Sequence, residues 1–184
     1  AVCSSVQPSP SALDPHTWLD PRTMIEYASA VSTELSQARP DSAATFQQRA
    51  DDLVKQLTTL DSEFSIGLTG CQRTVFVTSH AAFGYLAGRY GLEQVGITGL
   101  TPDAEPTPSR LAQVQKIAKE KGVTTIFSET LASPALADAL AKDLGLTTDV
   151  LDPLEGITSQ SRGTDYPSVM RSNLSALRTA GACQ

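Results

Sequence analysis

The spacing of apolar residues predicts two consecutive helices in the first part of the chain. Between residues 22 and 38 apolar side chains recur at helical intervals, and Pro21 is compatible with the first turn. Pro40 ends this pattern, and a second helix is predicted over residues 42–68. Its apolar stripe comprises Phe46, Ala50, Leu53, Leu57, Leu60 and Phe64. At about 1.5 Å per residue this helix would be roughly 40 Å long, which exceeds most globular helices.

After residue 70 the pattern changes to short β-rich runs that alternate with helical segments. The predicted strands cover residues 74–79, 94–98, 123–129 and 146–152. The predicted helices cover residues 81–91, 108–121, 133–145 and 166–180. Alternation of this kind predicts βαβ units, and therefore an α/β fold with a parallel sheet flanked by helices.

Composition excludes several classes of function. The chain has 184 residues, a formal net charge of −6 and no cluster of basic residues, so nucleic acid and anionic membranes are poor candidates for partners. No apolar stretch approaches the roughly 20 residues of a membrane span. The opening residues lack the basic start and apolar run of a signal peptide, so we expect a mature or shortened chain.

The three cysteines are Cys3, Cys71 and Cys183, and they form no CxxC motif. Cys71 precedes the first predicted strand, and Cys183 follows the last predicted helix. The two would meet if both elements belong to one layer of the fold. A Cys71–Cys183 disulfide, which we favour, would indicate an oxidising compartment and leave Cys3 unpaired. The alternative is three free thiols in a reducing compartment.

Side chains that bind metals gather where the predicted strands end. In an open parallel sheet the carboxyl ends of the strands share one rim, which brings His80, Glu129 and Asp152 together. The only other histidine, His16, lies in the loop "LDPHTWLDP" and could face this rim. Two histidines and a carboxylate suit zinc above all. The alternatives are a histidine that caps a helix and an Asp-Pro step that forms a turn.

Known catalytic and nucleotide-binding motifs are missing from the sequence. It contains no HExxH, no Walker A, no GxGxxG and no GxSxG motif. Ser79 and His80 are neighbours at a strand end and point apart, which disfavours a serine triad.

An ordered set of motifs resembles a known family. The set runs "DPHTWLDP", "FVTSHAAFGYLAGRYGL", "AEPTPSRLAQV", "IFSE", "DVLDPLEG" and "DYPSVMRSNLSAL", the last with a Tyr-x-x-x-Met-x-x-Asn pattern. Over residues 14–180 the chain resembles the zinc/manganese class of metal-binding solute-binding proteins of bacterial ABC transporters. The resemblance implies two α/β lobes joined by a long helix, with metal between them. Residues 1–39 would then be a remnant of the N-terminal lobe, residues 40–70 the connecting helix and residues 71–184 the C-terminal lobe.

The resemblance also implies a ligand set. It assigns His16, His80 and Asp152 to the metal, while an earlier histidine of the family has no counterpart here. Histidine at position 80, where manganese-binding members often carry glutamate, favours Zn²⁺ over Mn²⁺. Glu129 is expected in the second shell or at the rim, and Asp14 or Asp20 is expected to accept the second ring N–H of His16.

The implied function is extracytoplasmic binding of zinc, or less favourably manganese, and its delivery to an ABC-transporter permease. Such a protein is not an enzyme, and it is expected in the periplasm or as a cell-surface lipoprotein. Two alternatives stay open. One is a zinc hydrolase with Glu129 as its base, and the other is a surface interaction or adhesin module that binds no metal.

Overall fold

A parallel four-stranded sheet is the centre of the fold. The computed structural model describes residues 13–101 and 104–184. The strands are β1 (Val75–Thr78), β2 (Glu93–Gly96), β3 (Thr125–Ser128) and β4 (Thr147–Val150). They lie in the order β2-β1-β3-β4 and every neighbouring pair is parallel, so the α/β prediction is confirmed.

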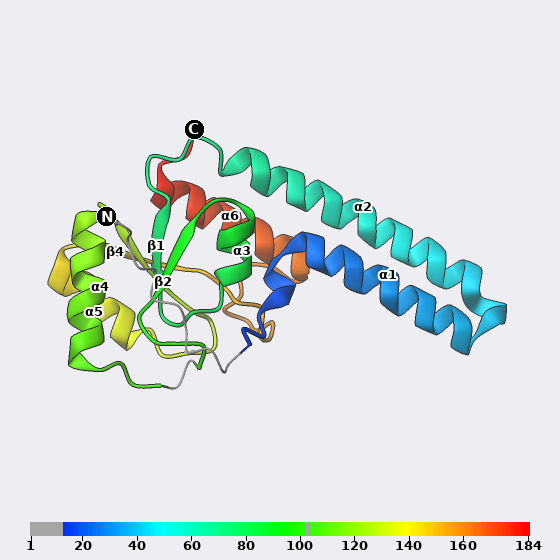
Figure 1. Ribbon diagram of the computed structural model, residues 1–184, viewed down its shortest axis with the longest axis horizontal. Coiled ribbons are helices and arrows are strands. Elements are labelled where there is room, and N and C mark those ends of the chain that lie inside the picture. Colours follow the sequence, from blue (N-terminus) through cyan, green and yellow to red (C-terminus); the bar gives the residue numbers. More distant parts are fainter. Residues whose placement is uncertain (1–12, 102–103) are drawn as a thin grey trace.

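Helices connect and flank the strands (Figure 1). They are α1 (Pro21–Ala38), α2 (Ala43–Gly67), α3 (Gly84–Arg89), α4 (Pro108–Glu120), α5 (Ala135–Leu144) and α6 (Tyr166–Gly181), with 3₁₀ turns at Thr17–Leu19 and Pro40–Ser42. The predicted helix over residues 81–91 is shorter than expected, because the residues that directly follow β1 form a loop before α3 begins. That loop carries His80.

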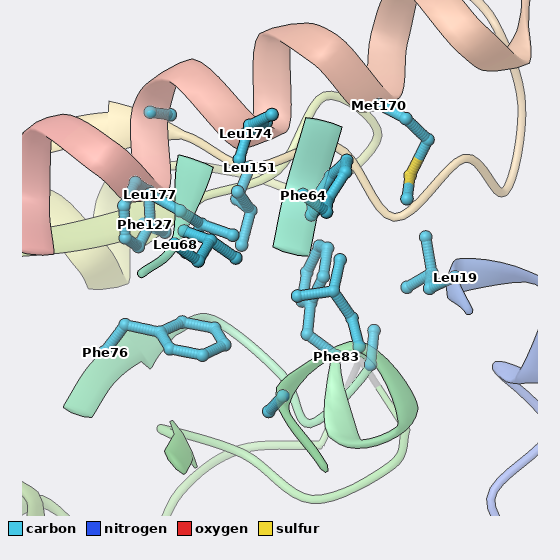
Figure 2. Packing of buried hydrophobic residues seen from close by; sticks show 14 of the residues in the cluster. Leu19, Phe64, Leu68, Phe76, Phe83, Phe127, Leu151, Met170, Leu174 and Leu177 are labelled. Atoms are coloured by element: carbon cyan, nitrogen blue, oxygen red, sulfur yellow. The ribbon is translucent and has the colours of Figure 1, made fainter. Parts of the chain in front are cut away.

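Both faces of the sheet are apolar, as a parallel sheet covered by helices requires. On β1, Val75 and Val77 belong to a core shared with α4 and α5, whereas Phe76 belongs to the core on the opposite face. The core that contains Phe76 brings together side chains from the sheet, α2, α3 and α6 (Figure 2). Leu19, from the turn just after His16, is fully buried in it.

Helices α1 and α2 form an antiparallel pair that extends away from the sheet (Figure 1). On the predicted stripe of α2, Leu57, Leu60 and Phe64 have no exposed surface, and Ala50, farther toward the N-terminal end, is also buried. Leu53 is 39% exposed, and on α1 Val31 is 57% exposed. The predicted stripe lies on one helix, and within it Leu53 is exposed and Phe46 is half-buried. Among the described residues, no helix combines the length and apolar character needed to cross a membrane.

A disulfide joins Cys71, just before β1, to Cys183, just after α6. The structure therefore contains the predicted pair, whereas Cys3 lies outside the described residues. The two cysteines are 112 positions apart, so the bond closes almost the whole α/β domain into one loop. A loop of this size restricts the unfolded chain strongly, by an entropy on the order of 4–5 kcal/mol.

We expect the double substitution Cys71→Ser and Cys183→Ser to lower the free energy of unfolding by about 2–5 kcal/mol. Urea unfolding of both proteins, followed by circular dichroism, measures the difference. Adding a reductant should destabilise the wild type and leave the double variant unchanged. Equal unfolding midpoints for the wild type and the variant would contradict the prediction.

Candidate metal centre

Three ligand atoms converge beyond the carboxyl ends of the strands. The Nε2 atoms of His16 and His80 lie 3.4 Å apart, and Glu155 Oε1 lies 3.3 Å from His16 Nε2 and 3.5 Å from His80 Nε2. These residues form the one group of three potential metal ligands found among the described residues. With bonds of about 2.0–2.1 Å, two ligand atoms of a tetrahedral zinc site lie roughly 3.3–3.4 Å apart. The three atoms therefore match one face of a zinc tetrahedron.

A carboxylate stands behind each histidine. Asp14 Oδ1 lies 2.7 Å from His16 Nδ1, and Glu129 Oε1 lies 2.6 Å from His80 Nδ1. Because a carboxylate accepts, each Nδ1 must carry the proton, and a neutral ring then presents a lone pair at Nε2. Three electron-pair donors thus face one another, an arrangement that a cation stabilises.

The centre is buried on the histidine side and open on the glutamate side. His16 is 2% exposed and His80 is fully buried, whereas the Glu155 side chain is 30% exposed. Burial, the largest influence on the pKa of His80, acts to lower it. The hydrogen bond to Glu129 and the negative charges of Glu129, Glu155 and Asp14 act together to raise it. The net result is a raised pKa, since the surrounding negative charge outweighs burial.

Local backbone interactions fix the loop that carries His16. Asp14 Oδ1 accepts from the His16 backbone N–H at 3.0 Å as well as facing the ring, so one carboxylate orients both. Asp20, the other residue considered for this role, caps α1 instead, and its Oδ1 accepts from the Arg22 N–H at 2.8 Å. Gly84 allows the approach of Asp14, because a Cβ there would lie 3.0 Å from Asp14 Oδ2.

His80 is held equally firmly at the end of β1. Glu129 Oε1 accepts from the His80 backbone N–H at 3.1 Å, in addition to its contact with the ring. The His80 carbonyl accepts from Thr78 Oγ1 at 2.6 Å and from Gln94 Nε2 at 3.0 Å. Both carboxylate contacts of Glu129 are thus directed at the back of His80, away from the face where a metal would bind.

Glu155 is the residue that sequence reasoning missed, and Asp152 is the one it named instead. Asp152 is buried, and its Oδ1 accepts from the Leu154 N–H at 2.8 Å. Its Oδ2 has no hydrogen-bonding partner among the described residues. The structure thus leaves Asp152 outside the three-residue group, and its role as a ligand stays a prediction. The motif "DVLDPLEG" holds both acids, but the strand-end rule selects only the first.

Trp18 joins the two loops that meet at the centre. Its Nε1 donates to the Pro153 carbonyl at 2.8 Å, and its ring lies 5.3 Å from the His16 ring, centroid to centroid. The Trp18 carbonyl accepts from Tyr166 Oη at 2.8 Å. The histidine loop is therefore tied to the glutamate loop and to the start of α6.

Residues 4–180 match the model of a family described as ZnuA, zinc-uptake complex component A, periplasmic. The chain belongs to the ZnuA family. The zinc-binding lipoprotein AdcA of Streptococcus pneumoniae, a relative, is 44% identical over 167 residues, which cover 90% of this chain. The matched region is 33% of AdcA, so the chain spans about a third of the length of that relative.

Solved structures of ZnuA-like proteins have the same fold. The laminin-binding protein Lbp of Streptococcus pyogenes superimposes with a TM-score of 0.85 at 36% identity, covering 91% of this chain and 65% of that one. The Zn(II)-bound ZnuA-like domain of Streptococcus pneumoniae AdcA superimposes with a TM-score of 0.79 at 40% identity, covering 97% and 68%. These family members are described as binding or transport proteins and none as an enzyme.

The hydrogen bonds predict the tautomer of each ring in the metal-free chain. Both histidines should carry the proton on Nδ1 when neutral, which ¹⁵N chemical shifts of the ring nitrogens report in samples where the rings are neutral. Glu129→Ala should release this preference at His80 and preserve it at His16, and Asp14→Ala should do the reverse. Each variant is the control for the other. Nε2–H tautomers in the wild type would contradict the assignment.

Proposed function

We propose that the protein captures zinc outside the cytoplasm and delivers it to the membrane permease of a zinc-uptake transporter. The observation that carries this proposal is the triangle formed by His16 Nε2, His80 Nε2 and Glu155 Oε1, with edges of 3.3–3.5 Å. Its edge lengths suit a tetrahedral ion, and its donors are two nitrogens and one oxygen. Relatives described as a zinc-binding lipoprotein and as a periplasmic zinc-uptake component support both the cargo and the location.

Donor chemistry favours zinc over manganese. Imidazole nitrogen suits zinc, whereas a harder cation such as Mn²⁺ prefers a set dominated by oxygen. The carboxylates of Asp14 and Glu129 increase the basicity of both rings, which strengthens their bonds to a borderline-soft ion. Mn²⁺ should therefore bind the same site more weakly than Zn²⁺.

A tetrahedral ion on this triangle has one position left for another ligand. We propose that water or a side chain from a second lobe takes this position, since the solved relatives are longer than this chain. On this proposal residues 1–39 belong to the second lobe, residues 40–70 connect the lobes and residues 71–184 form the lobe described above. The exposed apolar side chains of Tyr27, Val31 and Leu35 on α1 support it, because they offer a surface for further protein to cover.

Hydrolysis does not fit the arrangement of the carboxylates. A zinc hydrolase would need a base beside the metal-bound water, and Glu129 was the candidate. Its Oε1 instead contacts the ring and the backbone of His80 on the side away from Nε2. Binding without turnover is the simpler use of the site.

A competitive zinc titration of the 184-residue chain tests the proposal. We expect one saturable site, weakened at least about tenfold by His80→Ala and by Glu155→Gln, because each removes a ligand atom; tenfold corresponds to about 1.4 kcal/mol. Glu34→Gln, at an exposed carboxylate on α1, should bind like the wild type. Absence of a saturable site in the wild-type chain would refute zinc capture by this part of the protein.

Adhesion is a second candidate, because the similar structure from Streptococcus pyogenes is described as a laminin-binding protein. Surface plasmon resonance of the zinc-loaded chain on immobilised laminin tests it. Saturable binding that also occurs with His80→Ala would establish adhesion independent of the metal. No binding at micromolar concentrations would remove this candidate.

A further inference from the structure

The residue just before Glu155 has an unusual backbone conformation. Leu154 has φ of 57°, in the left-handed region that residues with a Cβ rarely occupy. Such a conformation costs energy and persists only where the surroundings impose it. The backbone bends at the next two residues, Glu155 and Gly156, so the side chain of Glu155 points in a direction that an extended segment would not give it. Here that side chain is the carboxylate that faces the two histidines.

Asp152 closes the turn that contains Leu154. Its Oδ1 accepts from the Leu154 N–H at 2.8 Å, across a proline that limits the freedom of the segment. Asp152 is only 2% exposed, so water does not compete for this hydrogen bond. The side chain of Leu154 packs against the core formed with α2, α3 and α6, which restrains the residue from the other side.

Asn173 of α6 fixes the backbone of Asp152 in turn. Its Oδ1 accepts from the Asp152 N–H at 2.9 Å, and its Nδ2 donates to the Asp152 carbonyl at 2.8 Å. The side-chain amide thus pairs with both backbone groups, as a neighbouring strand would. Asn173 is 2% exposed, so this pairing is also protected from solvent. Only Pro153 and Leu154 separate Asp152, whose backbone is held in this way, from Glu155. The conformation of these two residues therefore sets the position of the Glu155 carboxylate.

The same helix reaches the histidine loop. Tyr166, at the start of α6, donates to the Trp18 carbonyl, and Trp18 donates to the Pro153 carbonyl. Tyr166, Met170 and Asn173 are spaced four and three residues apart, so they share one face of α6. The Tyr-x-x-x-Met-x-x-Asn pattern therefore places two hydrogen-bonding side chains against the two loops that carry His16 and Glu155.

We propose that Asp152 and Asn173 are positioning residues, which hold Leu154 in the left-handed conformation and thereby aim Glu155 at the metal. This inference rests on the proposed function, in which Glu155 is a zinc ligand. It gives Asp152 a role different from that of a direct ligand. Because the fold orders Glu155 before metal arrives, binding does not have to overcome the entropy of ordering that loop.

Zinc affinities of four variants test the assignment. Asp152→Ala removes the acceptor for the Leu154 N–H and should weaken zinc binding at least about tenfold. Asp152→Asn keeps an oxygen at this position and should bind within about threefold of the wild type, because a positioning role needs the acceptor and not the charge. In the Glu155→Gln background, Asp152→Ala should add less than about twofold, since it acts through Glu155. Asn173→Ala should behave like Asp152→Ala.

A direct ligand would give a different result. If Asp152 binds the metal, Asp152→Asn should lose as much affinity as Asp152→Ala, and the losses from Asp152→Ala and Glu155→Gln should add. That outcome would overturn the proposal. Thermal unfolding of each variant identifies any that fail to fold, and Asp152→Asn, the mildest change, keeps the comparison decisive.

A measurement without metal separates this inference from the proposed function. In the metal-free chain, the strong intraresidue amide–Hα NOE of a left-handed residue should be present at Leu154 in the wild type and in Asp152→Asn. It should be lost in Asp152→Ala. If the wild type binds no zinc but shows these NOEs, the proposed function fails and the turn geometry stands. If Leu154 is left-handed in Asp152→Ala as well, Asp152 does not hold it and the inference fails.

Discussion

The centre depends on the constraint that three electron-pair donors must be held together before any cation neutralises their repulsion. His16, His80 and Glu155 come from segments far apart in sequence, and nothing in their local structure would bring them within 3.5 Å of one another. The parallel sheet supplies the position of His80 at the end of β1, and the carboxylates of Asp14 and Glu129 supply the tautomers. The free energy of folding thus offsets the repulsion among these groups, and a bound cation would relieve part of that repulsion.

The sequence predicted those features that follow from a repeating pattern. The apolar strands and the alternation with helices gave the parallel sheet, and the strand-end rule then led to His80 and Glu129. For the last strand the strand-end rule selected Asp152 and not Glu155, because the rule does not predict where residues beyond a turn are placed. Glu155 follows Leu154, whose φ is positive, and leucine gives no sign of that conformation in a sequence. Glycine or asparagine at position 154 would have signalled the turn.

The pair formed by α1 and α2 shows a second limit of sequence reasoning. Helical periodicity identifies which residues share a face, but it does not say whether that face is covered. On α2 the stripe residues Ala50, Leu57, Leu60 and Phe64 are buried, whereas Leu53, on the same stripe, is exposed. Whether an apolar residue of α1 or α2 is buried therefore depends on which other elements pack against it, as the exposed apolar residues of α1 also indicate.

The carboxylates around the two rings act on protons and on metal in the same direction. Asp14 and Glu129 strengthen the lone pairs of His16 and His80 by accepting their Nδ1 protons, and Glu155 adds negative charge in front. These charges also raise the pKa of His80, so the arrangement that attracts Zn²⁺ attracts a proton to the same Nε2. Of the three groups that face one another, only the Glu155 side chain is substantially exposed to solvent, at 30%. The site thus combines two buried histidines with one accessible carboxylate, so that a proton and a metal ion would compete for the same nitrogens.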